Sequence, residues 1–221
     1  MKKAVVLLSG GLDSATTLYY AQSKGYAVCA LIFDYGQRHR RELKSAMVLA
    51  RKADVPFKLV QISLPWKGSA LLDKTIRVPR QLGKKIPSTY VPARNIIFVS
   101  FAASYAEAIG ARAIFIGANA IDYSGYPDCR PEFFAAFQKA LDKGLRAGVE
   151  KKGISILTPL VKMTKAQIIS LGTKLGVPYH MTWSCYEGNK TPCGVCDSCR
   201  LRARGFQEAG MKDPVYGARK S

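Results

Sequence analysis

Short apolar runs alternate with segments of helical periodicity along most of this chain, and this alternation most constrains its fold. Runs of this length predict buried strands at 4–8, 27–33, 57–62, 113–116 and 154–157. The intervening patterns predict helices at 13–23, 40–52, 94–107, 131–145, 165–175 and 200–209. Strands that alternate with helices form βαβ units with parallel strands. The sequence therefore predicts an α/β fold with a Rossmann-like, doubly wound parallel sheet.

The alternation fails in two stretches. Residues 64–92 contain several prolines and basic residues, so we expect a long loop or irregular insertion there. After Pro178 a cysteine cluster, one helix and a basic tail complete the chain. We therefore predict a large α/β domain at 1–177 and a smaller metal-binding segment at 178–221. With 221 residues, 48% of them hydrophobic, the chain is long enough to bury a substantial core.

Basic residues dominate the charge of the chain. Lys and Arg number 34 against 15 Asp and Glu, a formal charge of +19, which suits nucleotides, nucleic acid or an acidic membrane surface. The apolar run at 4–8 is too short for a signal peptide. A span of about 18 apolar residues, as a transmembrane helix needs, does not occur. We therefore expect a cytoplasmic protein without a membrane partner.

A glycine-rich turn follows the first predicted strand, where the residues at 9–14 read Ser-Gly-Gly-Leu-Asp-Ser. Glycines between a strand and a helix let backbone N–H groups approach an anion, and the helix N-terminus adds a partial positive charge. The two serines can donate hydrogen bonds to phosphate oxygens, and Asp13 can bind Mg²⁺ or cap the helix. The alternative is an ordinary strand–turn–helix in which Asp or Ser is the N-cap.

The whole string resembles the PP-loop of ATP pyrophosphatases, a group that includes GMP synthetase, NAD synthetase and several tRNA-modifying enzymes. This resemblance implies that the chain binds ATP and cleaves it between the α and β phosphates, transferring AMP to a substrate oxygen. It also implies a nucleotide contact from a lysine further along the chain. The nucleotide-binding residues predicted in this way are Leu8, Ser9, Gly10, Gly11, Leu12, Asp13, Ser14, Ala15, Thr16 and Lys165.

Two further segments place polar groups where a parallel sheet binds ligands. Tyr35 and Gln37 follow the second predicted strand, and Arg94 and Asn95 lie in the first turn of a helix behind Pro92. A cation at a helix N-terminus opposes the helix dipole at a cost of a few tenths to about 1 kcal/mol. We therefore expect Arg94 to face a bound anion.

The segment at 117–133, Gly-Ala-Asn-Ala-Ile-Asp-Tyr-Ser-Gly-Tyr-Pro-Asp-Cys-Arg-Pro-Glu-Phe, is unusually rich in polar groups and flat rings. A loop of this composition at the end of a strand can bind a polar heterocycle by stacking and by hydrogen bonds to its edge. A simple turn before a helix that starts at Pro131 would not explain so many polar groups. Cys129 has no evident partner base, so we interpret it as structural or as lining the substrate site.

Together these motifs make the chain similar to the 7-cyano-7-deazaguanine synthase family over nearly its whole length. That resemblance implies conversion of 7-carboxy-7-deazaguanine to the nitrile with ammonia, ATP and Mg²⁺, through an adenylated carboxylate and an adenylated amide, in a homodimer. The substrate contacts that we expect are Tyr35, Gln37, Arg94, Asn95, Asn119, Asp122, Tyr126, Asp128 and Arg130. The catalytic contacts that we expect are Asp13, Arg94, Asp128 and Arg130.

Four cysteines form the pattern C-x7-C-x2-C-x2-C, at Cys185, Cys193, Cys196 and Cys199. Four thiolates can close a tetrahedral zinc site with no open position, which is typical of a structural site. A 4Fe-4S cluster also uses C-x2-C-x2-C, but the C-x3-C-P continuation is missing here. The pattern favours one structural Zn²⁺, as the resemblance also implies, over iron–sulfur and over disulfides.

Two other functions remain as alternatives. A PP-loop enzyme that modifies tRNA by thiolation or lysine transfer would use the basic surface to hold phosphates. The sequence shows no evident RNA-binding domain and no cysteine paired as a sulfur carrier, so we do not expect a nucleic-acid partner. A non-catalytic zinc ribbon that binds nucleic acid would leave the phosphate loop unexplained.

Overall fold

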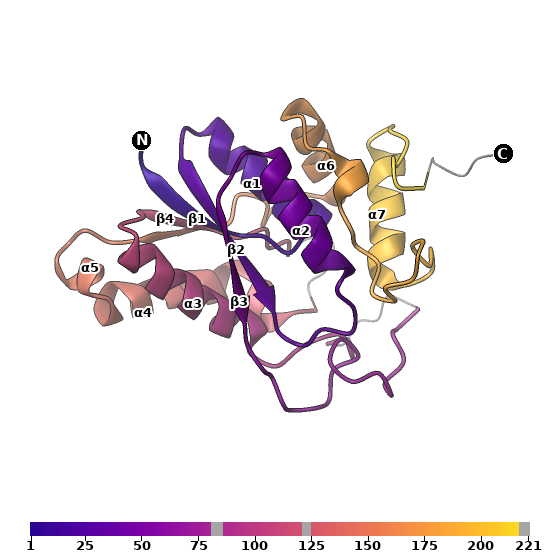
Figure 1. Ribbon diagram of the computed structural model, residues 1–221, viewed down its shortest axis with the longest axis horizontal. Coiled ribbons are helices and arrows are strands. Elements are labelled where there is room, and N and C mark those ends of the chain that lie inside the picture. Colours follow the sequence, from indigo (N-terminus) through magenta and orange to yellow (C-terminus); the bar gives the residue numbers. More distant parts are fainter. Residues whose placement is uncertain (81–85, 121–124, 217–221) are drawn as a thin grey trace.

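A five-stranded parallel sheet forms the centre of the computed structural model, which describes residues 1–80, 86–120 and 125–216 (Figure 1). Its strand order is β3-β2-β1-β4-β5, and every neighbouring pair is parallel. The strands are β1 (Lys3–Leu7), β2 (Ala27–Asp34), β3 (Phe57–Gln61), β4 (Ala113–Phe115) and β5 (Ser155–Leu157). The predicted α/β fold with a parallel sheet is confirmed.

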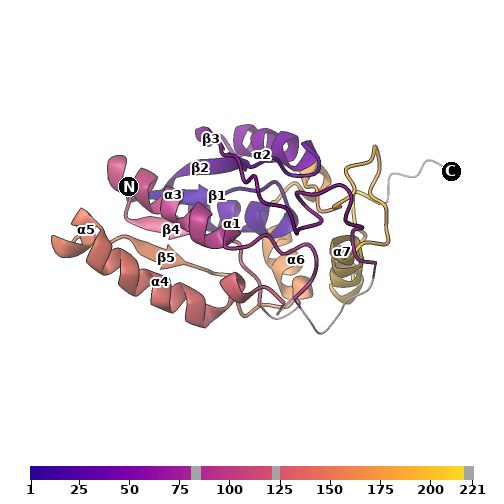
Figure 2. The same ribbon diagram turned by 90° about the horizontal axis from the view of Figure 1, so that it is seen from below.

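Helices cover both faces of the sheet (Figures 1 and 2). One face carries α1 (Leu12–Ser23), α2 (Arg41–Lys52), α6 (Lys165–Lys174) and α7 (Asp197–Glu208), and the other carries α3 (Arg94–Ala108) and α4 (Pro131–Gly144). A short α5 (Arg146–Val149) and two 3₁₀ turns, Pro127–Cys129 and Tyr179–Met181, complete the described elements. Side chains of β1 alternate between the two layers, because Val5 packs with α3 while Ala4 and Val6 pack with α1 and α2.

The direction of strand addition reverses beside β1. From β1 the chain adds β2 and β3 on one side, and it then returns to add β4 and β5 on the other side. In open parallel sheets such a switch leaves a crevice at the carboxyl ends of the strands, where ligands bind. The phosphate loop follows β1 and therefore lies at this crevice.

Predicted element boundaries agree with the structure to within a few residues, with two informative differences. Helix α7 begins at Asp197 rather than at 200, because Cys196 is its N-cap, so the last cysteine of the cluster lies inside the helix. Helix α5 was not predicted, since four residues are too few to show a periodicity. No helix in the described part of the chain is both long and apolar enough to cross a bilayer.

The C-terminal segment packs into the core of the sheet domain. Phe206 of α7 belongs to the same hydrophobic cluster as the buried residues of α1 and α6. The hydroxyl of Tyr179 lies 2.9 Å from that of Thr16, and the backbone N–H of Trp183 donates to the carbonyl of Gly10 at 2.9 Å. Residues 178–216 therefore share a hydrophobic core with the sheet that precedes them.

The described parts of the 64–92 segment contain no helix or strand, as expected of an irregular insertion. They lie against the cysteine-rich segment, where Ala70 and Val78 pack with Trp183 and the buried cysteines. Arg38 stabilises the insertion by donating hydrogen bonds to the carbonyls of Ala70 and Ile76, at 3.3 and 3.0 Å. The insertion thus supports the loop that carries the cysteines.

Candidate functional site

A cavity of about 310 Å³ opens at the carboxyl ends of β1, β2 and β4, at the expected crevice. It brings together the phosphate loop, the start of α3, the start of α6 and part of the C-terminal segment. The predicted site residues that line it are Leu8, Ser9, Gly11, Leu12, Asp13, Ser14, Tyr35, Gln37, Arg94, Asn95, Asn119, Tyr126 and Lys165.

The phosphate loop is braced by its own serines. The hydroxyls of Ser9 and Ser14 lie 3.0 Å apart, Gly11 N–H donates to Ser9 Oγ at 3.3 Å, and Ser14 Oγ donates to the Gly11 carbonyl at 3.1 Å. The N-cap of α1 is Gly11, which has no side chain to cap the helix. The alternative in which Asp or Ser is the N-cap is therefore wrong. N–H groups of the first turn remain available to an anion.

Two glycines allow neighbouring elements to contact this loop. Gly10 has φ of 88°, and a Cβ there would lie 2.8 Å from the Ala46 nitrogen of α2. Gly117 follows β4, and a Cβ there would lie 2.9 Å from the Ser14 nitrogen. Side chains at these positions would push α2 and β4 away from the loop, since real Cβ atoms do not come so close.

Lys165 reaches the phosphate loop from the far end of the sequence. Its Nζ lies 2.8 and 2.7 Å from the two carboxylate oxygens of Asp13, with both side chains partly buried. Thr164 and Gln167 have the spacing of a capping box, and the structure confirms it: Gln167 N–H donates to Thr164 Oγ1, and the Gln167 side chain accepts from Thr164 N–H. The capped start of α6 therefore holds Lys165 beside the loop.

Arg94 begins α3 on the opposite wall, with its Nη1 3.5 Å from the hydroxyl of Tyr35. Asp128 stabilises the first turn of α3 through two hydrogen bonds. Its Oδ2 accepts from Asn95 N–H at 3.0 Å, and its carbonyl accepts from Asn95 Nδ2 at 2.9 Å. Burial, and then the Asp128 carboxylate, raise the pKa of Cys129 to about 11. Cys129 is therefore a neutral thiol at neutral pH. It accepts a hydrogen bond from Asn95 and also lines the cavity, so both parts of the interpretation agree with the structure.

Some predicted site residues do not line the cavity. Ala15 and Thr16 are buried in α1, Gly10 lies under the loop against α2, and Asp128 is buried behind α3. Arg130 is exposed between the 3₁₀ turn and α4. Asp122 lies outside the described residues. Contacts of these residues with a ligand therefore stay predictions.

Other residues line the cavity although the sequence did not single them out. Six of them belong to the C-terminal segment: Trp183, Ser184, Tyr186, Ser198, Leu201 and Arg202. Another is Glu42, in the first turn of α2. Burial raises the pKa of the Glu42 carboxyl to about 7, although Arg94 opposes this shift. No local pattern marks these positions, because they reach the cavity only through the packing of distant segments.

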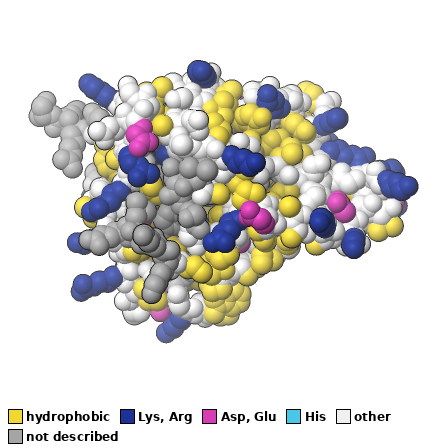
Figure 3. Space-filling view, turned by 180° about the vertical axis from the view of Figure 1, so that it is seen from behind, with side chains coloured by type: hydrophobic (Ala, Val, Ile, Leu, Met, Phe, Trp, Pro, Cys, Tyr) yellow, Lys and Arg dark blue, Asp and Glu magenta, His cyan; other side chains and the backbone are white. Residues whose placement is uncertain are grey.

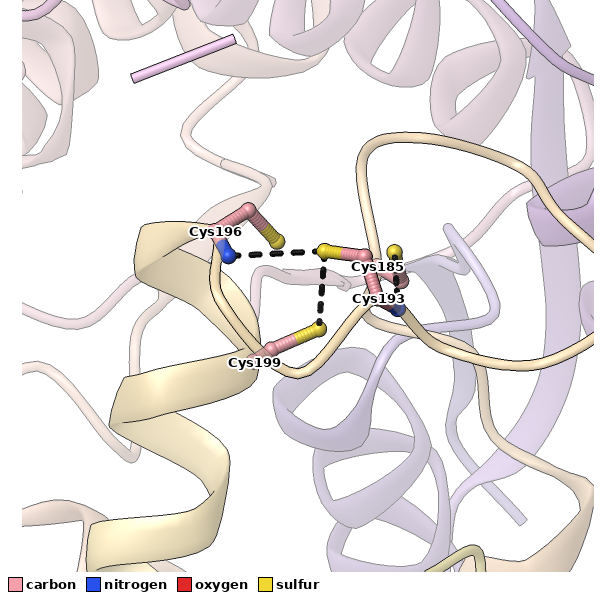
Figure 4. Close-up of side chains that lie close together, drawn as sticks. All are labelled: Cys185, Cys193, Cys196 and Cys199. Atoms are coloured by element: carbon pink, nitrogen blue, oxygen red, sulfur yellow. Dashed lines mark hydrogen bonds between the residues drawn. The ribbon is translucent and has the colours of Figure 1, made fainter. Parts of the chain in front are cut away.

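The four predicted metal ligands lie close together in the C-terminal segment, which also lines the cavity (Figure 4). Their sulfur atoms all lie within 4.8 Å of one another, and none of the cysteines forms a disulfide. Cys185 Sγ accepts from the N–H groups of Glu187 and Cys193, at 3.4 and 3.3 Å, as a thiolate would. A tetrahedron with metal–sulfur distances of about 2.3 Å has edges of about 3.8 Å. The cluster therefore fits a four-coordinate metal ion.

Comparison with known proteins gives consistent matches over the chain. A family model described as "Queuosine biosynthesis protein QueC" matches residues 3–210. A 7-cyano-7-deazaguanine synthase from Thermoplasma acidophilum is 58% identical, over 97% of this chain and 91% of the relative. The enzymes of the same name from Nostoc punctiforme and Clostridium kluyveri are 53% and 54% identical, covering 98% and 97% of this chain and 100% and 97% of the relatives.

Solved structures with the same fold are much less similar in sequence. The NMN synthetase from Francisella tularensis has a TM-score of 0.51 at 17% identity, over 98% of this chain and 81% of that chain. A predicted tRNA methyltransferase subunit from Methanocaldococcus jannaschii has a TM-score of 0.50 at 16% identity, over 79% and 76% of the two chains. At this level of identity the likeness extends to the fold alone.

Proposed function

Since the chain belongs to the QueC family of queuosine biosynthesis proteins, we propose that it is an ATP-dependent enzyme that converts 7-carboxy-7-deazaguanine into 7-cyano-7-deazaguanine. The reaction forms a carbon–nitrogen bond, and we propose ammonia as the nitrogen donor. One observation carries the assignment to this site: the uncapped start of α1 and the Arg94 side chain open into the same cavity. A nucleotide phosphate and an anionic substrate can therefore meet there.

The proposed chemistry adenylates oxygen twice, because neither a carboxylate oxygen nor an amide oxygen leaves unaided. A carboxylate oxygen attacks the α-phosphorus of ATP and pyrophosphate departs. Ammonia then attacks the acyl carbon and AMP departs, which leaves an amide. The amide oxygen is adenylated by a second ATP, and loss of AMP with the remaining N–H protons gives the nitrile. Catalysis on this scheme comes largely from holding the reactants together and stabilising developing charge.

We assign the phosphate contacts to the loop and Lys165, and the substrate carboxylate to Arg94. Backbone N–H groups at the start of α1 would bind phosphate oxygens, with the helix dipole favouring the negative charge. When Asp13 binds a metal ion instead of Lys165, the Lys165 ammonium group is free to bind a phosphate as a point charge. A carboxylate beside the loop suits Mg²⁺, so Asp13 would hold that ion, which would neutralise phosphate charge.

We propose that Cys185, Cys193, Cys196 and Cys199 hold one structural Zn²⁺ and that segment 178–221 forms the zinc-binding part of the chain. Four thiolates leave no open position for chemistry. The ion would stabilise the loop whose Trp183 donates to Gly10. Metal analysis of the purified protein separates zinc from iron–sulfur, since only the latter would bring iron and labile sulfide.

The test of function is an incubation with ATP, Mg²⁺, ammonium and 7-carboxy-7-deazaguanine. AMP, pyrophosphate and the mass of the deazapurine would be followed together. We expect a nitrile, an amide intermediate and one AMP for each adenylation. Release of pyrophosphate that depends on tRNA, with no change in the deazapurine, would instead favour the tRNA-modifying alternative.

On the face seen in Figure 3, the distribution of basic side chains gives little support to the tRNA-modifying alternative. There Lys and Arg side chains are scattered, and hydrophobic side chains gather between them, so no continuous basic stripe follows a nucleic-acid backbone. Relatives more than 50% identical over nearly the whole chain share one name for a small-molecule activity. The homodimer and the cytoplasmic location stay predictions, which size-exclusion chromatography and cell fractionation can test.

A further inference from the structure

Among the residues that the structure describes, two carboxylates line the cavity, Asp13 and Glu42, and their contacts differ. Asp13 is held by Lys165 through both of its oxygens. Glu42 has no hydrogen-bond donor and no Lys or Arg within 4.0 Å among the residues that the structure describes. Its side chain is only partly buried, so the carboxylate oxygens are open to hydrogen bonds from a ligand in the cavity. Glu42 can therefore accept from a ligand that carries N–H groups.

Glu42 lies close to the phosphate loop. The first turn of α2 rests on the phosphate loop, since a Cβ on Gly10 would strike the backbone at Glu42 and Ala46. Arg94 lines the same cavity and forms no ion pair with Glu42 among the described residues. Its charge nevertheless opposes the rise that burial causes in the pKa of Glu42. Glu42 thus lines the cavity that the phosphate loop and Arg94 also line, and it begins a helix that rests on the loop. On the proposed function the acyl adenylate forms in this cavity.

We propose that Glu42 binds the nitrogen nucleophile and accepts its proton, an inference that rests on the proposed function. Ammonia would donate a hydrogen bond to the Glu42 carboxylate while its lone pair forms the new bond to the acyl carbon. As the bond from that carbon to the AMP oxygen breaks, AMP leaves with the electron pair. One N–H proton passes to Glu42, and the product is the amide. Glu42 then loses this proton to solvent before the second stage.

The same carboxylate suits the second stage. After adenylation the nitrogen is an imidate N–H, and forming the nitrile requires that this proton leave while the bond to AMP breaks. The electron pair of the N–H bond becomes the third carbon–nitrogen bond, and the proton passes to Glu42. The raised pKa of Glu42 agrees with such a role, because a proton acceptor works best when its pKa lies near the working pH. One group therefore serves both stages.

Glu42 could also serve only to stabilise helix α2, and a control must separate this structural role from the proposed role in proton transfer. Glu42 is the second residue of α2, where any carboxylate stabilises the helix through its dipole. Glu132 is the second residue of α4, but it is exposed and does not line the cavity. Glu132→Gln is thus a matched control that removes the same charge from the same helical position away from the site.

The test compares adenylation with nitrogen attack in Glu42→Gln. Exchange of labelled pyrophosphate into ATP, with 7-carboxy-7-deazaguanine but without ammonium, reports adenylation alone. Amide and nitrile formation at varied ammonium chloride reports the nitrogen steps. We expect exchange close to the wild-type rate, a higher KM for ammonium, and product formation reduced by at least about 100-fold, the usual weight of a lost proton acceptor. Glu132→Gln should match the wild type in both assays.

Two results would overturn the inference. One is product formation by Glu42→Gln at the wild-type rate. The other is lost exchange with a raised KM for the deazapurine and an unchanged KM for ammonium, which would assign Glu42 to deazapurine recognition. If metal content or thermal unfolding shows that Glu42→Gln is misfolded, Glu42→Asp replaces it; it keeps the charge, so it should retain part of the nitrogen steps. Wild-type protein without any exchange would refute the proposed function itself.

Discussion

The two walls of the cavity are built in contrasting ways. The phosphate-loop wall, at 8–16, is held by hydrogen bonds between neighbours in sequence and by one glycine with positive φ. The C-terminal wall, at 183–202, has no helix or strand before the start of α7, and it depends on four sulfur atoms and a buried ion pair. Local geometry therefore encodes the first wall, whereas long-range contacts hold the second. Substitutions in the two walls should therefore differ in their effects on stability and activity.

Loss of the metal should give the largest effect, and it should fall first on the C-terminal wall. A structural zinc contributes roughly 10 to 16 kcal/mol of apparent binding energy in small folds. We expect Cys196→Ser, or chelation, to abolish nitrile formation and to expose 183–202 to limited proteolysis. Metal analysis and hydrogen exchange would check this. Cys29→Ser is the control, because Cys29 contacts Tyr105 outside the cluster. Full activity in metal-free protein would contradict the expectation.

The buried ion pair in the same wall should come next. Arg202 donates to both carboxylate oxygens of Asp213, at 2.7 and 2.9 Å, and also to the Tyr179 carbonyl at 3.1 Å. Breaking one partner of a buried pair costs about 3 to 5 kcal/mol. Asp213→Asn should therefore lower the free energy of unfolding by about that amount, measured by denaturant titration.

A surface pair provides the comparison for this variant. Glu208 pairs with Arg204 at 3.4 Å, and both side chains are half exposed. Such pairs contribute about 0.3 to 0.5 kcal/mol, so Glu208→Gln should change little. Equal effects of the two substitutions would show that the Arg202 pair does not hold the wall.

Gly10→Ala should damage the phosphate-loop wall. A residue other than glycine in the left-handed region costs about 1 to 2 kcal/mol, and here the new Cβ would also contact the backbone of α2. Gly25→Ala is matched, because Gly25 has φ of 77° and open space around its Cβ position. We expect Gly10→Ala to lose more stability than Gly25→Ala and to lose pyrophosphate exchange as well. Similar unfolding curves and exchange rates would argue against tight packing of α2 on the loop.

The smallest effect should come from the cap of α6. Thr164→Ala removes one half of the capping box at the helix that carries Lys165. Loss of an N-cap costs about 1 kcal/mol. We expect a drop in the free energy of unfolding of that size and a modest rise in the KM for ATP, measured by denaturant titration and steady-state kinetics. A change in stability without any change in KM would show that the cap does not position Lys165.

Much of the site could be predicted from the sequence because its signals are local. The Ser-Gly-Gly-Leu-Asp-Ser turn, the capping box at Lys165 and the spacing of the cysteines each concern residues that lie close together in the sequence. The strand and helix pattern likewise needs only the periodicity of apolar residues. The strands and helices, the turn after β1, the capping box and the proximity of the four cysteines are confirmed in the structure. The alternative in which Asp or Ser caps α1 is wrong, because Gly11 is the N-cap.

Only the tertiary structure decided which distant groups share the cavity. Glu42 lies in the first turn of an ordinary amphipathic helix, and Trp183 precedes the cysteine cluster, so the local pattern at neither position indicates that it lines the cavity. Conversely, Arg130 sits in a distinctive motif but is exposed, away from the lining of the cavity. The sequence by itself determined the sheet, the glycine-rich turn after β1 and the cysteine cluster, because backbone geometry and spacing act over short distances. Packing of α2 and α7 decided the remaining walls, since side chains far apart in sequence meet only in the folded chain.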